Sequence, residues 1–311
     1  MYFILPSTQS TTTSNIFLLD VDGTLVVSKS GRKWAENASD WIWTHPSVPA
    51  LIQEKAMTGW RIVLVSNQAM WTFEGSQAPA KMESILAALE SANGWRPWCF
   101  VATAKPKQKD TVYRKPGRGL YDLAISTMGL TQETVGSVVM CGDACGSEDP
   151  CPAYRWADSD RAFASNIGAQ FLRPCPWIPS RPAIEPSTTK EILILVGNPG
   201  SGKSSCAKHL VNHGYTHVEQ DLMKTPAATL RAAKTAIGTG SVIVDATHAS
   251  KKNRAPYIEL AHSLGVAVRI AWCIADGRPW NALRPKPVPE IAYAVYSKYF
   301  EEPTEAEVVL V

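Results

Sequence analysis

The chain has 311 residues, of which 45% are hydrophobic and 19% are charged, and its net charge is +3. This globular composition excludes a fibrous or wholly disordered chain, and the length suits about two domains. The longest apolar runs, such as Ile192 to Val196, are only strand-sized, so we expect no membrane span and no membrane partner. Seven cysteines without the spacing of a small secreted domain favour a reduced, intracellular compartment.

Positive charge is concentrated in the second half of the chain. Residues 181–289 hold 14 basic and 7 acidic side chains, whereas residues 1–180 hold 16 of each. A basic region suits an anionic ligand such as a nucleotide or a phosphate backbone, and a solvated surface would give the same count.

Short apolar runs alternate with helix-length segments along the chain. Strands separated by helices imply crossover connections, so the pattern predicts an α/β fold with two domains, each a mostly parallel sheet flanked by helices. The expected strands are Ile16–Asp20, Arg61–Ser66, Trp98–Thr103, Ser137–Cys141, Glu191–Val196, Ser241–Asp245 and Val266–Cys273. The expected helices are Ala80–Ser91, Lys203–Asn212, Ala227–Ile237, Arg254–Leu264 and Glu290–Phe300.

A proline-rich segment divides the chain. Five prolines lie between residues 173 and 186, and proline fixes φ and removes backbone donors. We therefore expect neither a helix nor a central strand there, but a semi-rigid linker over residues 173–189. The predicted domains are residues 16–172 and 190–311, and residues 1–15 are predicted to form a flexible tail.

The first expected strand ends in two carboxylates, Asp20 and Asp22, followed by Gly23 and Thr24. In extended backbone both carboxylates point to one side, where they repel each other unless a cation or a shared proton lies between them. Magnesium meets this need because it takes oxygen ligands. One carboxylate could attack phosphorus while the other, if protonated, donates to the leaving oxygen. Alone, the pair fits a solvated turn equally well.

Other groups suited to phosphate chemistry follow further along the first domain. Ser66 and Asn67 end the next expected strand and offer a hydroxyl and an amide to phosphoryl oxygens. Lys115, before Pro116, supplies a cation, and Asp143 follows another apolar strand. Because ligands of parallel sheets lie at the carboxyl ends of the strands, we expect these side chains to meet there.

This ordered set resembles the haloacid dehalogenase-type phosphatases. It resembles more closely the 3′-phosphatase domain of the polynucleotide kinase 3′-phosphatase family, through Ser66-Asn67-Gln68, Arg114-Lys115-Pro116 and Ser159-Asp160-Arg161 among other stretches. The resemblance implies a haloacid dehalogenase-like fold. It implies the following roles: Asp20 as the nucleophile that forms an aspartyl-phosphate, Asp22 as general acid and base, Ser66 and Lys115 as phosphoryl-binding groups, and Asp20, the Asp22 carbonyl and Asp143 as magnesium ligands.

The carboxylate that supports this site alongside Asp143 is left open by the sequence. Family members usually carry an acidic residue five positions before the Asp160-Arg161 pair, and this chain has Arg155 there. The candidates are therefore Asp149, Asp158 and Asp160.

The expected strand Glu191–Val196 runs directly into a complete G-x-x-x-x-G-K-S motif, which ends at Ser204. Glycines let the backbone N–H groups curl around phosphates, and the next helix begins there with the positive end of its dipole. Lys203 would reach the β- and γ-phosphates of ATP, and Ser204 would bind magnesium. The candidate nucleotide-binding residues are Gly197, Asn198, Gly200, Ser201, Gly202, Lys203 and Ser204.

Two later carboxylates follow in the second domain: Asp221 lies at the end of a further short strand-like stretch that begins at Tyr215, and Asp245 ends the expected strand Ser241–Asp245. The first could be a base for a hydroxyl acceptor and the second could orient magnesium, although each also fits a strand-end cap. In order and spacing they resemble the P-loop kinase domain of the same family, which implies that Asp221 activates a 5′-hydroxyl. Arg284 resembles the lid arginine that contacts the ATP phosphates, and Gln220 stands where family members usually have arginine.

Together these resemblances imply a bifunctional enzyme that uses Mg²⁺ and ATP. Such an enzyme removes 3′-phosphates and phosphorylates 5′-hydroxyls at DNA or RNA ends in strand-break repair, which also implies the nucleus. We expect a monomer. The motifs alone also permit a small-molecule phosphatase fused to a small-molecule kinase, or a module that binds broken DNA ends without turnover.

Overall fold

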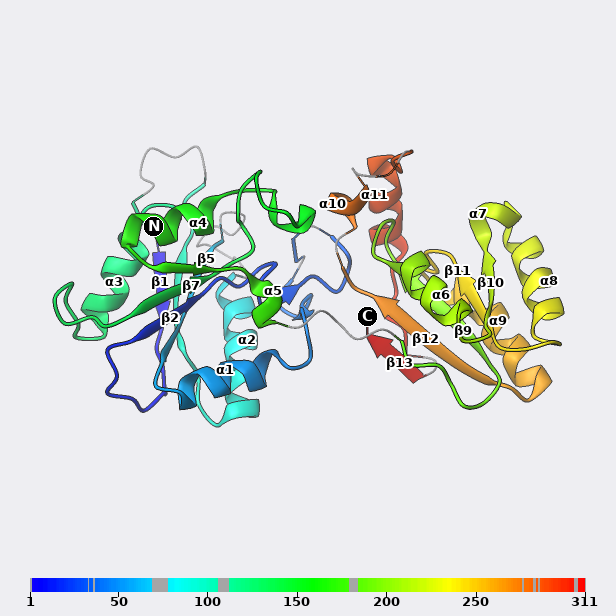
Figure 1. The fold of residues 1–311 in the computed structure, drawn as a ribbon, viewed down its shortest axis with the longest axis horizontal. Coiled ribbons are helices and arrows are strands. Elements are labelled where there is room, and N and C mark those ends of the chain that lie inside the picture. The colour runs from blue at the N-terminus through cyan, green and yellow to red at the C-terminus, as the bar shows by residue number, and fades with distance from the viewer. Residues whose placement is uncertain are drawn as a thin grey trace. The chain divides into compact units, whose positions relative to one another are not determined.

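The computed structural model describes residues 2–32, 34–35, 37–68, 78–105, 112–178, 184–275, 277–281, 284, 286–304 and 307–310. The chain divides into two compact units (Figure 1). The first comprises Met1–Val27 and Glu36–Ser180, and the second comprises Ser28–Ala35 and Arg181–Val311. None of the described helices combines the length and the apolar character needed to cross a bilayer.

The first unit is built on a six-stranded sheet in the order β1-β6-β5-β2-β7-β8. Neighbouring strands run parallel except β1, which pairs antiparallel with β6. The strands are β1 (Tyr2–Leu5), β2 (Ile16–Leu19), β5 (Arg61–Asn67), β6 (Trp98–Ala102), β7 (Val138–Cys141) and β8 (Gln170–Leu172), and β3 (Val26–Val27) pairs separately with β4 (Ile42–Trp43). The helices are α1 (Val48–Met57), α2 (Ala78–Asn93), α3 (Gly119–Thr127), α4 (Ser159–Ile167), the short α5 (Pro174–Trp177) and a 3-10 turn, Pro152–Tyr154.

Helices cover both faces of this sheet (Figure 1). On one face Phe17 and Leu19 of β2 pack with the buried side chains of α1 and α2. On the other face Ile16 and Leu18 pack with those of α3 and α4. A strand covered on both faces must be apolar at every position, which explains the unbroken Ile-Phe-Leu-Leu run.

The second unit is built on a parallel five-stranded sheet in the order β10-β11-β9-β12-β13. Its helix α6 packs on one face with Leu193 and Leu195 of β9, α9 contacts β9 and β12, and α8 contacts β10 and β11. The strands are β9 (Glu191–Gly197), β10 (Thr216–Glu219), β11 (Val242–Asp245), β12 (Ala267–Cys273) and β13 (Glu307–Leu310). The helices are α6 (Lys203–Val211), α7 (Gln220–Met223), α8 (Pro226–Ala236), α9 (Lys251–Leu264), α10 (Arg278–Asn281) and α11 (Glu290–Tyr299).

The predicted fold class, two mostly parallel sheets flanked by helices, is confirmed. Each of the seven expected strands is present with both ends within one residue of the expected position, and each of the five expected helices within three residues. Continuous apolar runs bounded by turn residues located these elements, because tertiary burial on two faces requires such runs.

Two expectations about the segments outside the predicted domains differ from the structure. Residues 2–5 were expected within a flexible tail, but they form β1, because Phe3 and Leu5 pack on one core cluster and Ile4 on the other. In the expected linker, Pro174–Trp177 forms the four-residue α5, with proline at its first turn. Non-helical backbone at Cys175 limits this helix, in keeping with the proline content.

The topology places both sets of motifs at equivalent points of the two sheets. In the first unit β2 lies between β5 and β7, and in the second β9 lies between β11 and β12. Where the chain continues to opposite sides of a central strand, the loops beyond that strand diverge and leave a crevice for a ligand. Asp20 follows β2, and the glycine-rich loop follows β9.

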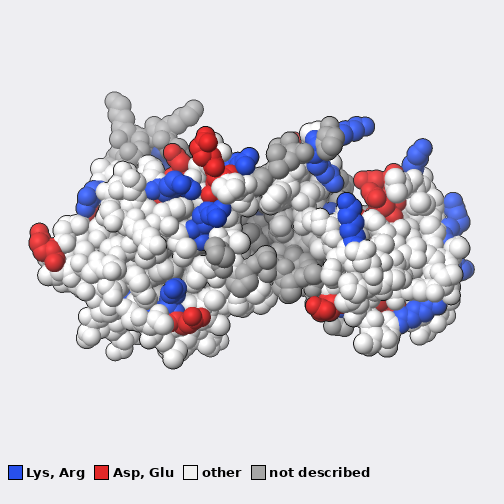
Figure 2. All heavy atoms as spheres, viewed as in Figure 1, with Lys and Arg blue, Asp and Glu red and all other residues white. Residues whose placement is uncertain are grey.

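On the face shown in Figure 2, Lys and Arg side chains are interspersed with Asp and Glu side chains on both units. The charges that matter for chemistry are instead the buried ones at the strand ends, described below.

A buried ion pair fixes the start of β9. Glu191, 2% exposed, accepts from Arg269 Nη2 at 2.7 Å and from the Tyr215 hydroxyl at 2.6 Å.

We expect Arg269→Ala to lower the free energy of unfolding of the second unit by about 3–5 kcal/mol, because it leaves a buried carboxylate without its cation. Arg118→Ala, which removes an exposed ion pair with Asp122 of α3, is the control. It should lower the free energy of unfolding by about 0.5 kcal/mol or less. Denaturant titrations followed by circular dichroism measure both, and equal losses would contradict the prediction.

Candidate functional site

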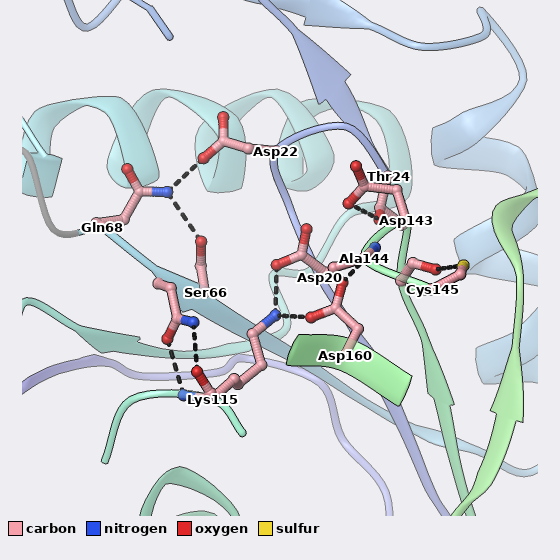
Figure 3. Close-up of polar contacts among 12 residues, drawn as sticks. Asp20, Asp22, Thr24, Ser66, Gln68, Lys115, Asp143, Ala144, Cys145 and Asp160 are labelled. Atoms are coloured by element: carbon pink, nitrogen blue, oxygen red, sulfur yellow. Dashed lines mark hydrogen bonds and ion pairs between the residues drawn. The ribbon is translucent and has the colours of Figure 1, made fainter. Parts of the chain in front are cut away.

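A buried lysine joins two carboxylates at the end of β2. Lys115 Nζ lies 2.5 Å from Asp20 Oδ1 and 2.6 Å from Asp160 Oδ1. The lysine side chain is 1% exposed, and the two carboxylates are 10% and 2% exposed. Asp160, at the start of α4, also accepts from the backbone N–H of Ala144 at 3.0 Å. Figure 3 shows the three side chains converging from β2, the loop before α3, and α4.

Asp143, after β7, completes a group of three carboxylates. Each of Asp20, Asp143 and Asp160 offers an oxygen atom within 4.8 Å of the other two. The indole Nε1 of Trp156 donates to Asp143 Oδ2 at 2.7 Å, and the Thr24 hydroxyl donates to Asp143 Oδ1 at 3.4 Å. Neutral donors thus orient Asp143 without cancelling its charge.

Two glycines make room for these carboxylates. A Cβ on Gly23, which has φ of +85°, would lie 2.2 Å from Asp143 Oδ2. A Cβ on Gly142 would lie 2.4 Å from Asp160 Oδ2. Both distances are far below van der Waals contact, so any side chain at either position would displace the carboxylate. The glycines that follow Asp22 and precede Asp143 are therefore needed for the site to close.

The electrostatics of the group show an excess of negative charge. Burial raises the pKa of Asp20 from 3.8 to about 7; Lys115 opposes the rise, and the neighbouring Asp160 adds to it. Burial likewise raises the pKa of Asp143, with Asp20 and Asp160 adding to the rise. Burial alone would lower the pKa of Lys115, but the two carboxylates beside it raise it. One ammonium does not balance three carboxylates, which favours a further cation.

The residues present fit magnesium. All three groups offer oxygen, the ligand atom that Mg²⁺ takes, and all three are buried within 4.8 Å of one another. Among the three candidates left open by the sequence, Asp160 is the one that lies in this group. Asp149 is buried elsewhere between Arg161 and Arg173, and the Asp158 side chain is exposed.

Asp22 lies outside this group. Its carboxylate is directed to the amide of Gln68 (Figure 3), which donates to Asp22 Oδ2 and, at 2.8 Å, to the Ser66 hydroxyl. Lys81 of α2 contacts the other oxygen, Asp22 Oδ1. The two aspartates of the sequence pattern therefore have separate surroundings, which allows them separate roles.

Asn67, expected to face phosphoryl oxygens, has its amide occupied by the backbone of Lys115. Asn67 Nδ2 donates to the Lys115 carbonyl at 3.0 Å, and the Lys115 N–H donates to Asn67 Oδ1 at 3.0 Å. This reciprocal pair fixes the loop that carries the lysine to the end of β5. In this structure Asn67 thus positions a cation.

The glycine-rich loop of the second unit lies between β9 and α6. Lys203 is 8% exposed, and its Nζ donates to the carbonyls of Gly197 at 2.9 Å and Asn198 at 2.7 Å. The Asn198 side chain accepts from the N–H of Gly277 at 3.2 Å, which ties the loop to the segment before α10. Among the described residues, the buried Ser201 hydroxyl is without a hydrogen-bond partner, which suits a loop that receives phosphate oxygens.

Asp245, at the end of β11, lies beside the start of α6. Its Oδ2 accepts from the Ser204 hydroxyl at 2.9 Å and lies 3.1 Å from His217 Nε2. Burial would raise the pKa of Asp245, but His217, Lys203 and Ser204 together lower it. Ser204 and the ionised Asp245 form an oxygen pair that fits the magnesium ion of a nucleotide.

Asp221 and Arg284 are exposed, at the start of α7 and after α10. Burial lowers the pKa of Lys203; Arg284 lowers it further, whereas Asp245 and Asp221 oppose the change. These charged groups therefore lie within electrostatic reach of Lys203. The structure brings Lys203, Ser204 and Asp245 together and leaves Asp221 and Arg284 at the exposed rim.

Several residues of the two sites were not singled out from the sequence. Gln68 was noted only as part of a motif. Lys81 had one signal, its position one turn before Ile85 on an otherwise apolar helix face. Trp156 and His217 had none, because each contacts its carboxylate through folding of a separate segment.

A family model described as polynucleotide kinase 3 phosphatase matches residues 15–177. A bifunctional polynucleotide phosphatase/kinase of Schizosaccharomyces pombe is 27% identical over 329 aligned positions, which cover 95% of this chain and 78% of the relative. A protein of Acanthamoeba polyphaga mimivirus, to which the same two activities are provisionally ascribed, is 28% identical over 78% of this chain and 68% of its own length.

Among solved structures, a D,D-heptose 1,7-bisphosphate phosphatase from B. bronchiseptica, complexed with magnesium and phosphate, matches with a TM-score of 0.40 and 20% identity. The match covers 50% of this chain and 78% of that one.

We expect Asp160→Asn to weaken Mg²⁺ binding on the order of 10- to 100-fold, because it removes one charge of the carboxylate group. Asp158→Asn is the matched control two residues away, exposed and outside that group, and should bind Mg²⁺ as the unaltered protein does. Calorimetric titration of each protein with MgCl₂ measures the difference. Equal affinities for the two variants would rule out Asp160 as the supporting carboxylate.

The raised pKa of Asp20 predicts a pH dependence of stability in metal-free protein. Between 3.8 and about 7 the folded state keeps a proton on Asp20 that the unfolded state releases. Stability should therefore be greatest below pH 3.8 with respect to this group, and fall as the pH rises to about 7. Thermal unfolding of the first unit in EDTA at several pH values tests this, and Asp20→Asn should flatten the dependence. The prediction would be contradicted if the part of the stability that Asp20→Asn removes increased as the pH rose from 3.8 to about 7.

Proposed function

Because this chain belongs to the polynucleotide kinase 3 phosphatase family, whose model spans residues 15–177, we propose that it is a bifunctional end-processing enzyme. The first unit would remove a 3′-phosphate from a nucleic-acid strand, and the second would transfer the ATP γ-phosphate to a 5′-hydroxyl. The observation that carries the proposal is the buried group of Lys115 with Asp20, Asp143 and Asp160, in a chain with a separate phosphate-binding loop.

For the phosphatase step, Asp20 is the proposed nucleophile. One Asp20 oxygen attacks phosphorus, the bond from phosphorus to the strand's O3′ breaks, and O3′ takes a proton from Asp22. Water then attacks the aspartyl-phosphate and gives a proton back to Asp22, which releases inorganic phosphate and restores Asp20. Lys115 stabilises the charge on the phosphoryl oxygens, and the Ser66 hydroxyl holds one of them.

Asp20, the Asp22 carbonyl, Asp143 and Asp160 would hold Mg²⁺ in this site. When bound, the ion would offset part of the negative charge of the three carboxylates and of the phosphate dianion, which would otherwise repel one another. The chain itself supplies the positioning: Asn67 holds the Lys115 backbone, and Trp156 and Thr24 orient Asp143.

For the kinase step, the loop from Gly197 to Ser204 would bind the phosphates of ATP, with Ser204 and Asp245 toward its magnesium ion. Lys203 would exchange its two carbonyl partners for phosphate oxygens. Asp221 would take the proton of the 5′-hydroxyl, and Arg284 would contact the phosphates from the rim. The likeness to the fission yeast phosphatase/kinase, which covers 95% of this chain, supports assigning both activities to one protein.

The product of the two steps is an end pair with a 3′-hydroxyl and a 5′-phosphate, the form that joining requires. We therefore place the enzyme in DNA strand-break repair and in the nucleus, acting as a monomer on DNA ends. This part of the proposal rests on family membership.

The two activities should be separable by single substitutions. On a gapped duplex with 3′-phosphate and 5′-hydroxyl ends, Asp20→Ala should lower 3′-dephosphorylation at least about 1000-fold, because the nucleophile is lost, and leave 5′-phosphorylation intact. Lys203→Ala should do the reverse, because the charge that meets the γ-phosphate is lost.

The assay supplies Mg²⁺ and ATP and resolves the labelled ends by gel electrophoresis. Wild-type rates of phosphate release by Asp20→Ala would refute the proposed nucleophile. If the unaltered enzyme left the duplex ends untouched but turned over nucleosides or sugar phosphates, the polynucleotide substrate would be refuted.

A further inference from the structure

Lys81 is a buried lysine that neither the motif set nor the proposed chemistry accounts for. It lies in the first turn of α2, 2% exposed, beside the buried Met82 and one turn before the buried Ile85. An ammonium group removed from water is strongly unfavourable unless an opposite charge accompanies it. Its Nζ contacts Asp22 Oδ1. Asp22 supplies the opposite charge whenever it is ionised, as it is in the proposed mechanism once its proton has passed to O3′.

The other oxygen of Asp22 has a separate donor. Gln68 Nε2, beyond the end of β5, donates to Asp22 Oδ2 and also to the Ser66 hydroxyl at 2.8 Å. Each carboxylate oxygen of Asp22 is thus held by a different element, α2 or the segment after β5. Figure 3 shows the resulting orientation, with Asp22 turned toward Gln68 and the Ser66 side of the site.

The pair is asymmetric in a way that suits a positioning role. Lys81 is 2% exposed, whereas the Asp22 side chain is 22% exposed and so reachable from outside. A buried pair maintained for stability alone could be replaced by apolar side chains at little or no cost. Here the buried cation instead orients a partly exposed acid that lies two residues from the nucleophile.

We propose that Lys81 is a positioning residue that holds Asp22 in line with the leaving O3′ atom of the strand. The inference rests on the proposed function of the first unit. Lys81 would act through Asp22 and leave binding of the phosphate to Ser66 and Lys115. Since misplacing a reacting group by about 1 Å can cost about 100-fold in rate, losing this contact should appear in kcat and spare KM.

The chemistry of the leaving group offers a selective test. When the bond from phosphorus to O3′ breaks, the departing alkoxide needs the proton of Asp22. When sulfur replaces that bridging atom, the bond from phosphorus to sulfur breaks and a thiolate leaves. A thiolate is a much weaker base than an alkoxide, so it can depart without taking a proton. Two oligonucleotides that differ only in this atom therefore separate proton delivery to the leaving group from the other contributions. Release of the strand is followed in a single turnover, because the later hydrolysis of the aspartyl-phosphate is the same for both substrates.

We expect Lys81→Met to lower kcat for the ordinary 3′-phosphate by about 10- to 100-fold with KM little changed. The loss on the 3′-bridging sulfur substrate should be at least about tenfold smaller, because no proton is needed. Lys81→Arg, which keeps the charge, should recover part of the rate. Lys55→Met, which removes the α1 lysine over the Phe17 ring, is the matched control and should not alter the ratio of the two rates.

Lys81→Gln is assayed alongside Lys81→Met, and thermal unfolding identifies which of them is folded. Equal losses on the two substrates in a folded variant would show a structural role only and overturn the inference. Asp22→Asn tests the premise separately. If this variant also loses equal rates on the oxygen and sulfur substrates, the proposed role of Asp22 is wrong. If Asp22→Asn loses more on the oxygen substrate and the Lys81 variants do not, the role of Asp22 stands and the positioning role of Lys81 is rejected.

Discussion

The arrangement of the first unit depends on one buried ammonium group between carboxylates. Lys115 lies within 2.6 Å of both Asp20 and Asp160, with almost no exposure to solvent. Without it, three acidic groups would share a site from which water is excluded, and their mutual repulsion would be large. With it, one ammonium still faces three carboxylates, and burial, together with the neighbouring carboxylates, raises the pKa values of Asp20 and Asp143. This charge balance favours a further cation beside the three carboxylates, as the proposed function requires.

The sequence could predict the parts of this site that follow directly from strand ends. In a parallel sheet the loops after neighbouring strands meet, so Asp20, Ser66 and Asp143 come together once β2, β5 and β7 are identified. The same reasoning joins the loop after β9 to Asp245 at the end of β11. Apolar runs located these strands, because a strand buried on both faces is apolar at consecutive positions and is therefore recognisable in the sequence.

The sequence could not show which side chains of the intervening segments reach the site, because this depends on how those segments fold. Asp149, Asp158 and Asp160 lie within a dozen positions and are alike in chemistry. Asp160 reaches the site because it lies at the start of α4 and because Gly142 leaves space for its carboxylate. No local sequence pattern encodes this contact between separate segments. Lys81 is similar, since its contact with Asp22 spans 59 positions. β1 was missed because four residues beside a Ser/Thr-rich stretch carry little signal until they pair with β6.

In the proposed mechanism, the two buried lysines serve two different kinds of phosphate chemistry. Lys115 is paired with carboxylates that raise its pKa, so its place is fixed relative to the nucleophile before any substrate arrives. Lys203 donates only to neutral carbonyls among its described hydrogen bonds, and burial lowers its pKa. Its charge is therefore less compensated, and a triphosphate entering the loop gains more from it than the carbonyls do. A covalent step requires an attacking atom held in line with its cation, whereas a transfer between two bound substrates requires a cation that can follow the phosphate. The different partners of the two lysines meet these different requirements on two sheets with the same strand-end geometry.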